Sequence, residues 1–222
     1  MLFASDARVE ASRKAWLGSV QRKANVRLSR TLTRTTKLTA ERTGFPVFHI
    51  PSKLQIGESF GERLQHAFAS VFAQGYERVL AIGNDCIGLR SNDLIEAANR
   101  LEYNAVVAGP TPRGGIYVLG LRRSAFETLP ITGLAWLQPN LFQSLQQAVS
   151  GQHQQLAELP IRVDANTLQD LIRHWHLLSQ VADLRQWLRH LLFGTGRTLV
   201  IGAPRPVVDM HWHGPLHRGP PC

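Results

Sequence analysis

Short apolar runs alternate along the chain with longer segments whose apolar residues recur every three or four positions. Val79–Gly83 is continuously apolar, which is typical of a strand covered on both faces. Further strands are predicted at residues 1–4, 46–50, 105–109, 116–121 and 161–163, and helices at residues 17–30, 60–75, 91–101, 141–148 and 167–178. The alternation predicts an α/β fold of three layers, in which a mainly parallel, mixed sheet has helices on both faces.

The strand and helix signals end near residue 194. A chain of 222 residues fits one α/β domain more easily than two, so we expect a single domain over residues 1–194. Residues 195–222 are predicted to be an irregular tail, wrapped on the domain or partly disordered, because prolines and scattered glycines replace the periodic pattern. The prolines are Pro204, Pro206, Pro215, Pro220 and Pro221.

Composition bounds the compartment and the class of protein. Hydrophobic residues make up 44% of the chain, enough for a full core, yet no stretch reaches the roughly 18 apolar residues of a membrane-spanning helix. The two cysteines, Cys86 and Cys222, are too few for a disulfide framework. We therefore expect a soluble, cytoplasmic protein.

Positive charge is concentrated near the start of the chain. The formal net charge is +9, and residues 7–42 contain ten Lys or Arg against only Glu10 and Glu41. Such a run can serve nucleic acid, an anionic membrane face or a phosphate-rich substrate, or it can be the solvated face of a helix, which is the favoured interpretation. Nucleic acid is disfavoured, because aromatic residues do not interleave with the basic ones as in a stacking platform.

Asp85 is the first candidate for chemistry, because it lies two residues after the apolar run at residues 79–83. Ligands of open α/β sheets bind outside the carboxyl ends of the strands, and a carboxylate there can hold a divalent cation that bridges phosphate oxygens. The alternative is that Asp85 caps the next helix or supports a turn. Gly114 and Gly115 precede another strand, where they either let backbone approach a ligand or form an ordinary hairpin-type turn.

Two other positions have competing interpretations. Glu62 lies in the first turn of a predicted helix, whose free N–H groups can receive an anion, and its carboxylate is a candidate general base. It is also suited to be only a first-turn charge, which is the favoured interpretation. In the tail, His211, His213 and His217 have metal-like spacing but lack a Cys or acidic partner, which favours a packing or binding edge.

Four sequence blocks in order resemble those of a bacterial family of glycosyltransferase-like proteins of unknown function. That family is similar to GT-A nucleotide-diphosphosugar transferases and to the guanylyltransferases of molybdenum-cofactor and deazaflavin biosynthesis. The resemblance covers about residues 1–175 and implies a Rossmann-like GT-A fold. The blocks are Gln55-x-Gly57-x-x-Phe60-Gly61-Glu62-Arg63-Leu64, Gly83-Asn84-Asp85-Cys86-x-Gly88-Leu89, Gly109-Pro110-x-x-Arg113-Gly114-Gly115-x-Tyr117-x-x-Gly120-Leu121 and Asp164-x-Asn166-Thr167-x-x-Asp170-Leu171.

The resemblance implies a metal-assisted nucleotide site. The strand-end Asp that reaches the metal and the phosphates matches Asp85, with Asn84 beside it in the same block. Asp164 or Asn166 would be a second ligand of a Mg or Mn ion from across the cleft. The loop that cradles nucleotide would fall on Ser5 to Lys14, which puts the side chains at its end near phosphate: Arg13 and Lys14.

One departure from the family pattern concerns the metal. Family members usually have Asp-Gly-Gly where this chain has Arg113-Gly114-Gly115. Exchanging a negative for a positive charge reverses an interaction of about 4 kcal/mol at 4 Å and an effective dielectric of 20, which weakens any cation site that includes this position. Either Arg113 clamps a diphosphate itself, or the site has lost catalysis and kept binding.

The expected function is transfer of a sugar from a nucleotide-diphosphosugar donor to an unknown acceptor. Asp85 would hold the diphosphate through the ion, while Glu62 and Asp164 are candidates for the general base. Two alternatives stay open: nucleotidylyl transfer from a nucleoside triphosphate, and a non-catalytic descendant that binds an anionic ligand or partner.

Overall fold

The computed structural model describes residues 1–194 of the chain. Residues Met1–Gln186 form one compact unit, which ends within the last described helix. The predicted tail and its histidines lie outside the described residues, so the boundary placed after residue 194 stays a prediction.

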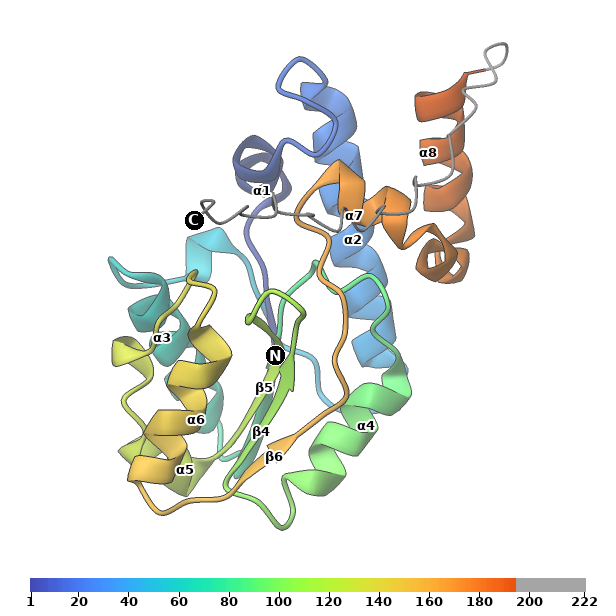
Figure 1. The fold of residues 1–222 in the computed structure, drawn as a ribbon. Helices are drawn as coiled ribbons and strands as arrows, with labels where there is room; N and C mark the ends of the chain where they lie inside the picture. The colour runs from blue at the N-terminus through green and yellow to red at the C-terminus, as the bar shows by residue number, and fades with distance from the viewer. Residues whose placement is uncertain (195–222) are drawn as a thin grey trace, which may run out of the picture. The chain divides into compact units, whose positions relative to one another are not determined.

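A sheet forms the centre of the compact unit (Figure 1). It has six strands, in the order β2-β1-β3-β5-β4-β6. All neighbouring strands pair in parallel except β5, which runs antiparallel to β3 and β4. Five of the six strands therefore share one direction, and the expectation of a mixed, mainly parallel sheet is confirmed. The strands are β1 Leu2–Phe3, β2 His49–Ile50, β3 Arg78–Ile82, β4 Val106–Pro110, β5 Ile116–Arg122 and β6 Leu156–Glu158.

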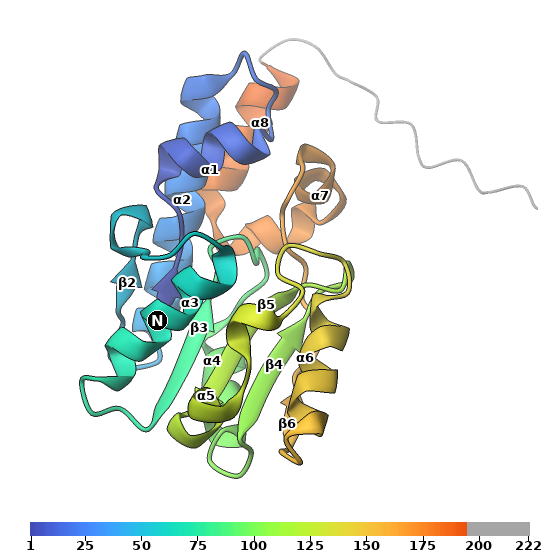
Figure 2. The same cartoon turned by 90° about the vertical axis from the view of Figure 1, so that its left-hand side faces the viewer.

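Helices cover both faces of this sheet, as expected (Figure 2). One face packs against α3, α5 and α6, and the other against α4 and the end of α2. The α-helices are α1 Ala7–Lys14, α2 Arg22–Glu41, α3 Phe60–Phe72, α4 Ser91–Arg100, α5 Arg123–Thr128, α6 Leu141–Gly151, α7 Leu168–Arg173 and α8 Ala182–Phe193. The 3₁₀-helices are η1 Ser52–Leu54, η2 Ile131–Gly133 and η3 Trp175–Gln180.

Two hydrophobic cores result, one on each side of the sheet. Along β4, Val106 and Ala108 belong to the core under α3, whereas Val107 belongs to the core under α4. This alternation follows from the strand geometry, in which successive side chains point to opposite faces. All three are fully buried, which explains the continuous apolar run in the sequence.

The basic segment is organised differently from the prediction. The helix expected at residues 17–30 begins only at Arg22, and Val20 is 92% exposed in the loop before it. A separate helix, α1, occupies most of the segment in which a nucleotide-cradling loop was expected. Positive φ angles at Ala15 and Gly18 separate the two helices, because a left-handed residue ends a right-handed helix.

The prediction of a strand at residues 161–163 is also wrong. The edge strand is β6, and the chain continues from it as an extended segment with isolated bonds from Leu159 and Arg162 to β4. Pro160 has no backbone N–H, so it interrupts the ladder. Asp164 then forms an isolated bridge with Cys86, which brings this segment to the end of β3.

The starts of α3 and α7 each carry a capping box. Thr167 accepts a bond from the Asp170 N–H before α7, and Ser59 does the same with Glu62 before α3. The helix predicted over residues 167–178 is interrupted after Arg173 and continues as η3. Ser91 is the first residue of α4, where the helix predicted from residue 91 begins.

Candidate functional site

A pocket of about 550 Å³ opens at the edge of the sheet where the parallel strands end. Its lining includes the residues after β1 and β3, the start of β5, the first turn of α3 and the loop before α6. We call it the sheet-edge pocket. Because β5 runs opposite to its neighbours, its first residues lie at the same edge as the last residues of β3. The fold thus places Asp85 and Gly115 on one pocket.

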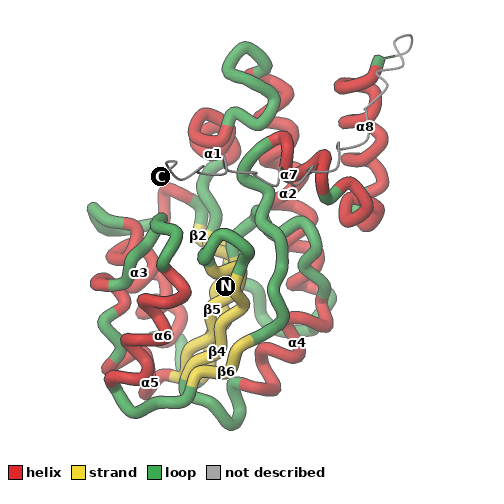
Figure 3. Tube along the Cα trace, viewed as in Figure 1, coloured by secondary structure: helices red, strands yellow, loops and turns green. Residues whose placement is uncertain are grey.

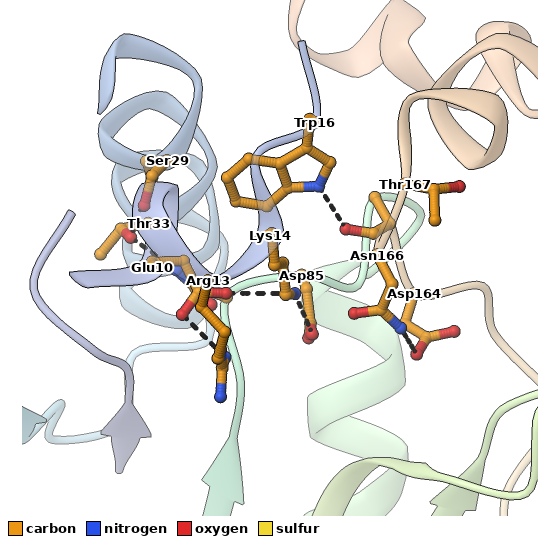
Figure 4. A network of polar contacts seen from close by, with 12 residues as sticks. Glu10, Arg13, Lys14, Trp16, Ser29, Thr33, Asp85, Asp164, Asn166 and Thr167 are labelled. Atoms are coloured by element: carbon orange, nitrogen blue, oxygen red, sulfur yellow. Dashed lines mark hydrogen bonds and ion pairs between the residues drawn. The ribbon is translucent and has the colours of Figure 1, made fainter. Parts of the chain in front are cut away.

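Asp85 lies just past β3, and its side chain is 29% exposed to the pocket. One carboxylate oxygen, Oδ2, accepts a bond from the Lys14 ammonium at 2.8 Å (Figure 4). Burial alone raises the pKa of Asp85, but the neighbouring positive charge outweighs it, so the net pKa is lowered. Asp85 is therefore ionised at neutral pH.

Lys14 is held between two carboxylates. Its Nζ lies 2.8 Å from Asp85 Oδ2 and 3.1 Å from Glu10 Oε1, and Arg13 binds the other Glu10 oxygen at 2.9 Å (Figure 4). Burial favours the neutral amine, yet Asp85 and Glu10 together raise the pKa of Lys14 above its ordinary value. The pocket therefore has a fixed ammonium at the end of β3.

Trp16 contacts both the Lys14 ammonium and the segment around Ala165. Its indole Nε1 donates to the Ala165 carbonyl at 2.8 Å, and its ring centroid lies 5.4 Å from Lys14 Nζ. The Ala165 N–H in turn donates to the Asp85 carbonyl at 2.8 Å. These bonds hold the segment with Asp164 and Asn166 next to Asp85.

Asp164 supplies a second carboxylate to the same pocket, and Asn166 donates its side-chain amide to it (Figure 4). Burial raises the pKa of Asp164, and the negative charge of Asp85 raises it further. The two carboxyl groups are therefore near enough to interact but have different environments. Such a pair can divide acid–base work and ion binding between its members.

The donor set suits a hard divalent cation only in part. Asp85, Asp164 and the amide oxygen of Asn166 are the oxygen ligands that Mg²⁺ or Mn²⁺ takes, and Mg²⁺ commonly uses one or two carboxylates with substrate phosphates. Within residues 1–194, no group of three His, Cys, Asp or Glu is arranged to hold a metal ion. An ion there would need oxygen ligands from a substrate to complete its shell.

Arg113 lines the pocket with half of its side chain exposed, and its guanidinium makes a bidentate pair with Asp170. The two bonds measure 3.1 and 2.5 Å. Asp170 also accepts the N–H groups of Asn166 and Thr167. Burial opposes ionisation of Asp170, but these bonds prevail and lower its pKa. Arg113 therefore ties the β4–β5 turn to the segment that carries Asp164.

The two glycines after Arg113 have different surroundings. Gly114 has φ +75° and lies against the next loop, where an added Cβ would stand 1.7 Å from the Pro139 carbonyl oxygen. Its own carbonyl accepts a bond from Phe142 at the start of α6. Gly115 lines the pocket. Because Gly114 has no side chain, residues 134–141 can pack closely against it, whereas Gly115 faces the cavity.

Of the remaining predicted site residues, two line the pocket and one does not. Ser5 lines the pocket, as does Asn84, whose amide donates to Thr33 Oγ1 at 2.9 Å. Glu62 does not line it: its carboxylate accepts the N–H groups of Glu58 and Ser59 in the capping box, and these bonds lower its pKa. Glu62 is thus used to cap α3.

An aromatic wall at the pocket was missed in the sequence. Phe3, Phe60 and Trp136 line the pocket, and the ring centroid of Phe60 lies 5.5 Å from that of Phe3 and 5.2 Å from that of Trp136. Trp136 is oriented by its Nε1, which donates to the Ile131 carbonyl at 2.6 Å. Their spacing fits core positions equally well, so nothing in the sequence singled them out. The pocket combines cationic groups from α1 with flat apolar rings.

Glu10 and Trp16 were missed as well. Glu10 is 2% exposed and holds both Arg13 and Lys14. The i,i+4 spacing of Glu10 and Lys14 is a helical ion-pair signal that would have indicated α1. Trp16 had no such signal, because its partner Ala165 is distant in the sequence.

Comparison with known proteins identifies the family. Residues 19–136 match the model of a family described as "Uncharacterized protein conserved in bacteria (DUF2064)", and the chain belongs to it. No curated protein matches the chain.

Two solved structures are similar to the chain. One named "putative nucleotide-diphospho-sugar transferase", from Desulfovibrio desulfuricans G20, has a TM-score of 0.65 and 19% identity, covering 84% of this chain and 96% of its own. Rv0371c from Mycobacterium tuberculosis H37Rv has a TM-score of 0.43 and 13% identity, covering 80% of this chain and 96% of its own. The first match confirms the expected α/β fold.

Proposed function

We propose that this member of the family binds a nucleotide-diphosphosugar in the sheet-edge pocket and transfers the sugar to an acceptor. The observation that carries the proposal is the Lys14–Asp85 pair at the end of β3, where ligands of open α/β sheets bind. A buried ammonium beside a pocket of about 550 Å³ suits an anionic ligand of nucleotide size.

In this reaction a nucleophile of the acceptor attacks the anomeric carbon of the sugar. The bond from that carbon to the diphosphate oxygen breaks, and its electron pair leaves with the nucleoside diphosphate. The main task of the protein is to position the reactants and stabilise the charge on the leaving group. Lys14 and Arg13 supply positive charge for that purpose.

The acceptor must lose a proton, and Asp164 is the best-placed candidate to take it. It lines the pocket and has a raised pKa, which makes its carboxylate a stronger base than an ordinary Asp. Asp85, held ionised by Lys14, would bind a Mg²⁺ or Mn²⁺ ion together with donor phosphates. When bound, that ion would neutralise charge on the departing diphosphate.

The aromatic wall gives the ligand's rings a place to pack. Phe60 and Trp136 are only partly buried, so their faces are available to a sugar or a base. Carbohydrate and base faces both pack on aromatic rings, and the cations on α1 would fix the diphosphate between such contacts.

A thermal-shift screen of sugar nucleotides, with and without Mg²⁺ or Mn²⁺, tests the proposal. We expect a matching donor to raise Tm, and to raise it further with the ion. Asp85→Asn should lose the ion-dependent part of the shift and keep the ion-free part, because Lys14 remains.

Other outcomes of the same experiment decide between functions. Pyrophosphate release from a nucleoside triphosphate would show that the activity is nucleotidylyl transfer and not sugar transfer. A Tm shift without any release of nucleoside diphosphate, across a panel of acceptors, would indicate a binding protein. A flat screen across sugar nucleotides and triphosphates would overturn the proposal.

A further inference from the structure

A second concave surface lies on the other side of α1. It has a volume of about 890 Å³ and lies between α1 and α2; we call it the α1–α2 groove. It shares no lining residue with the sheet-edge pocket, because α1 turns Lys14 toward the pocket and Arg8 and Ser12 toward the groove. Its lining contains no acidic residue and five basic ones: Arg8, Arg22, Lys23, Arg27 and Arg30.

Four of these cations are available to a partner. Arg8, Arg22, Lys23 and Arg30 are exposed, and none of the four forms an ion pair within the described part of the chain. Unneutralised cations gathered in a concave surface raise the local potential and attract anions.

The positive charge continues beyond the groove along α2. Lys23, Arg27, Arg30, Arg34 and Lys37 follow one another at steps of four and three residues, which places them on one face of the helix. At 1.5 Å per residue, this stripe is about 21 Å long. No acidic residue occurs in α2 before Glu41. The length suits an extended anionic surface rather than a single small anion.

Exposed aliphatic side chains accompany the cations. Val20 is 92% exposed in the loop at residues 15–21, and Val9 is 54% exposed on α1. The loop extends beyond both helices, at the top of Figure 3. Two hydrogen bonds connect the loop to α2, because the buried Asn25 accepts the Leu17 N–H and donates to the Gly18 carbonyl, both at 2.9 Å. The loop therefore presents Val20 outward from a fixed position.

We propose that the α1–α2 groove and its loop bind the surface of an anionic phospholipid bilayer, with Val20 entering the headgroup region. Basic residues around a projecting aliphatic side chain are typical of interfacial contacts, where electrostatic attraction and apolar burial add. Single-stranded nucleic acid fits less well, since it prefers aromatic stacking, and Trp16 of this segment is 4% exposed.

Vesicle flotation with the full chain tests this directly. We expect binding to vesicles of phosphatidylcholine mixed with phosphatidylglycerol, little binding to phosphatidylcholine alone, and loss of binding at high salt. The double variant Arg22→Glu/Lys23→Glu should bind about tenfold more weakly or worse. Val20→Ser should weaken binding without any change of charge.

The matched control carries the same change of charge elsewhere. Arg42 and Lys53 are exposed and lie outside the groove lining, so Arg42→Glu/Lys53→Glu should retain most of the binding. Equal loss in both double variants would overturn the proposal, because net charge alone would then explain it. Unchanged circular dichroism and Tm would show that the variants fold.

Two further results would also overturn it: equal binding to neutral vesicles, or groove-dependent binding of labelled RNA or duplex DNA without any vesicle binding. No sugar nucleotide enters these measurements, so their failure is separable from failure of the proposed transferase activity.

Discussion

At the scale of single residues, the sheet-edge pocket depends most on Lys14. Its ammonium joins Glu10, which is 2% exposed, to Asp85, which faces the cavity at 29% exposure. A buried carboxylate is costly unless it is paired, so Glu10 needs its cationic partners. One side chain thus both stabilises α1 and sets the charge of the pocket.

Replacing Lys14 should therefore cost stability. In Lys14→Met, Glu10 keeps only Arg13, and removing one member of a buried pair typically costs about 3 kcal/mol. The free energy of unfolding in urea measures the loss. Lys37→Met is the control, since Lys37 is half exposed and its pair with Glu41 is 3.6 Å long; its change should stay below about 0.5 kcal/mol. Equal losses would contradict the role of Lys14.

Asp170 should make stability depend on pH in the acid range. Its pKa in the folded chain lies below the ordinary value of 3.8, so its contribution is complete above that pH and is lost as the pH falls through the lowered pKa. Asp170→Asn should cost about 1–2 kcal/mol at neutral pH, reduced because Arg113 is half exposed.

Urea unfolding from about pH 7 to about pH 3 checks this. The difference between the natural chain and Asp170→Asn should stay constant above about pH 5 and shrink below about pH 4. A difference that grew on acidification would refute the assignment.

At the scale of elements, the β4–β5 turn supports one wall of the pocket. Gly114 lies under residues 134–141, and this loop carries Trp136. Arg113 binds the turn to Asp170 on the opposite side. The turn therefore connects the aromatic wall to the segment with Asp164 and Asn166.

Gly114→Ala should disturb both stability and ligand binding. The new Cβ would collide with the Pro139 carbonyl, and the alanine would have to adopt a left-handed backbone conformation at φ +75°. Gly75→Ala separates the two effects, because Gly75 has φ +91° but nothing within 4 Å of an added Cβ. Gly75→Ala should cost about 1–2 kcal/mol from backbone strain alone. Gly114→Ala should cost clearly more in urea unfolding and should move the loop; a cost equal to that of Gly75→Ala would contradict the contact.

Most elements were predictable because their apolar spacing is regular. The buried runs at β3, β4 and β5 and the apolar stripes of α3, α4 and α6 lie where the pattern placed them. α1 was missed because its buried face consists of Glu10 and Ala11 rather than an apolar stripe. Pro160 prevented the strand predicted near residue 162, and pairing with β4 made β6 instead.

At the scale of the whole molecule, the fold brings distant segments to one sheet edge. Asp85, Asp164 and Lys14 meet there from the end of β3, the segment after β6 and the end of α1. The position of Asp85 followed from the strand-end rule. The Lys14 ammonium at its carboxylate did not, since a tertiary contact across 71 positions leaves no periodic trace in the sequence.

The proposed lipid contact does not involve a membrane-spanning helix. No helix in the described part of the chain is long and apolar enough to span a bilayer. The proposed lipid contact is a surface contact of α1, α2 and their loop, and it uses charges that the pocket does not.

Calorimetric titration of a sugar nucleotide tests the central claim most directly, with the donor identified by the thermal-shift screen. The account predicts that the natural chain binds it, that Lys14→Gln weakens binding by about tenfold or more through loss of a charge-assisted contact, and that Lys37→Gln binds normally. Unchanged affinity in Lys14→Gln would contradict the account, because the ammonium at the end of β3 would then not contact the ligand.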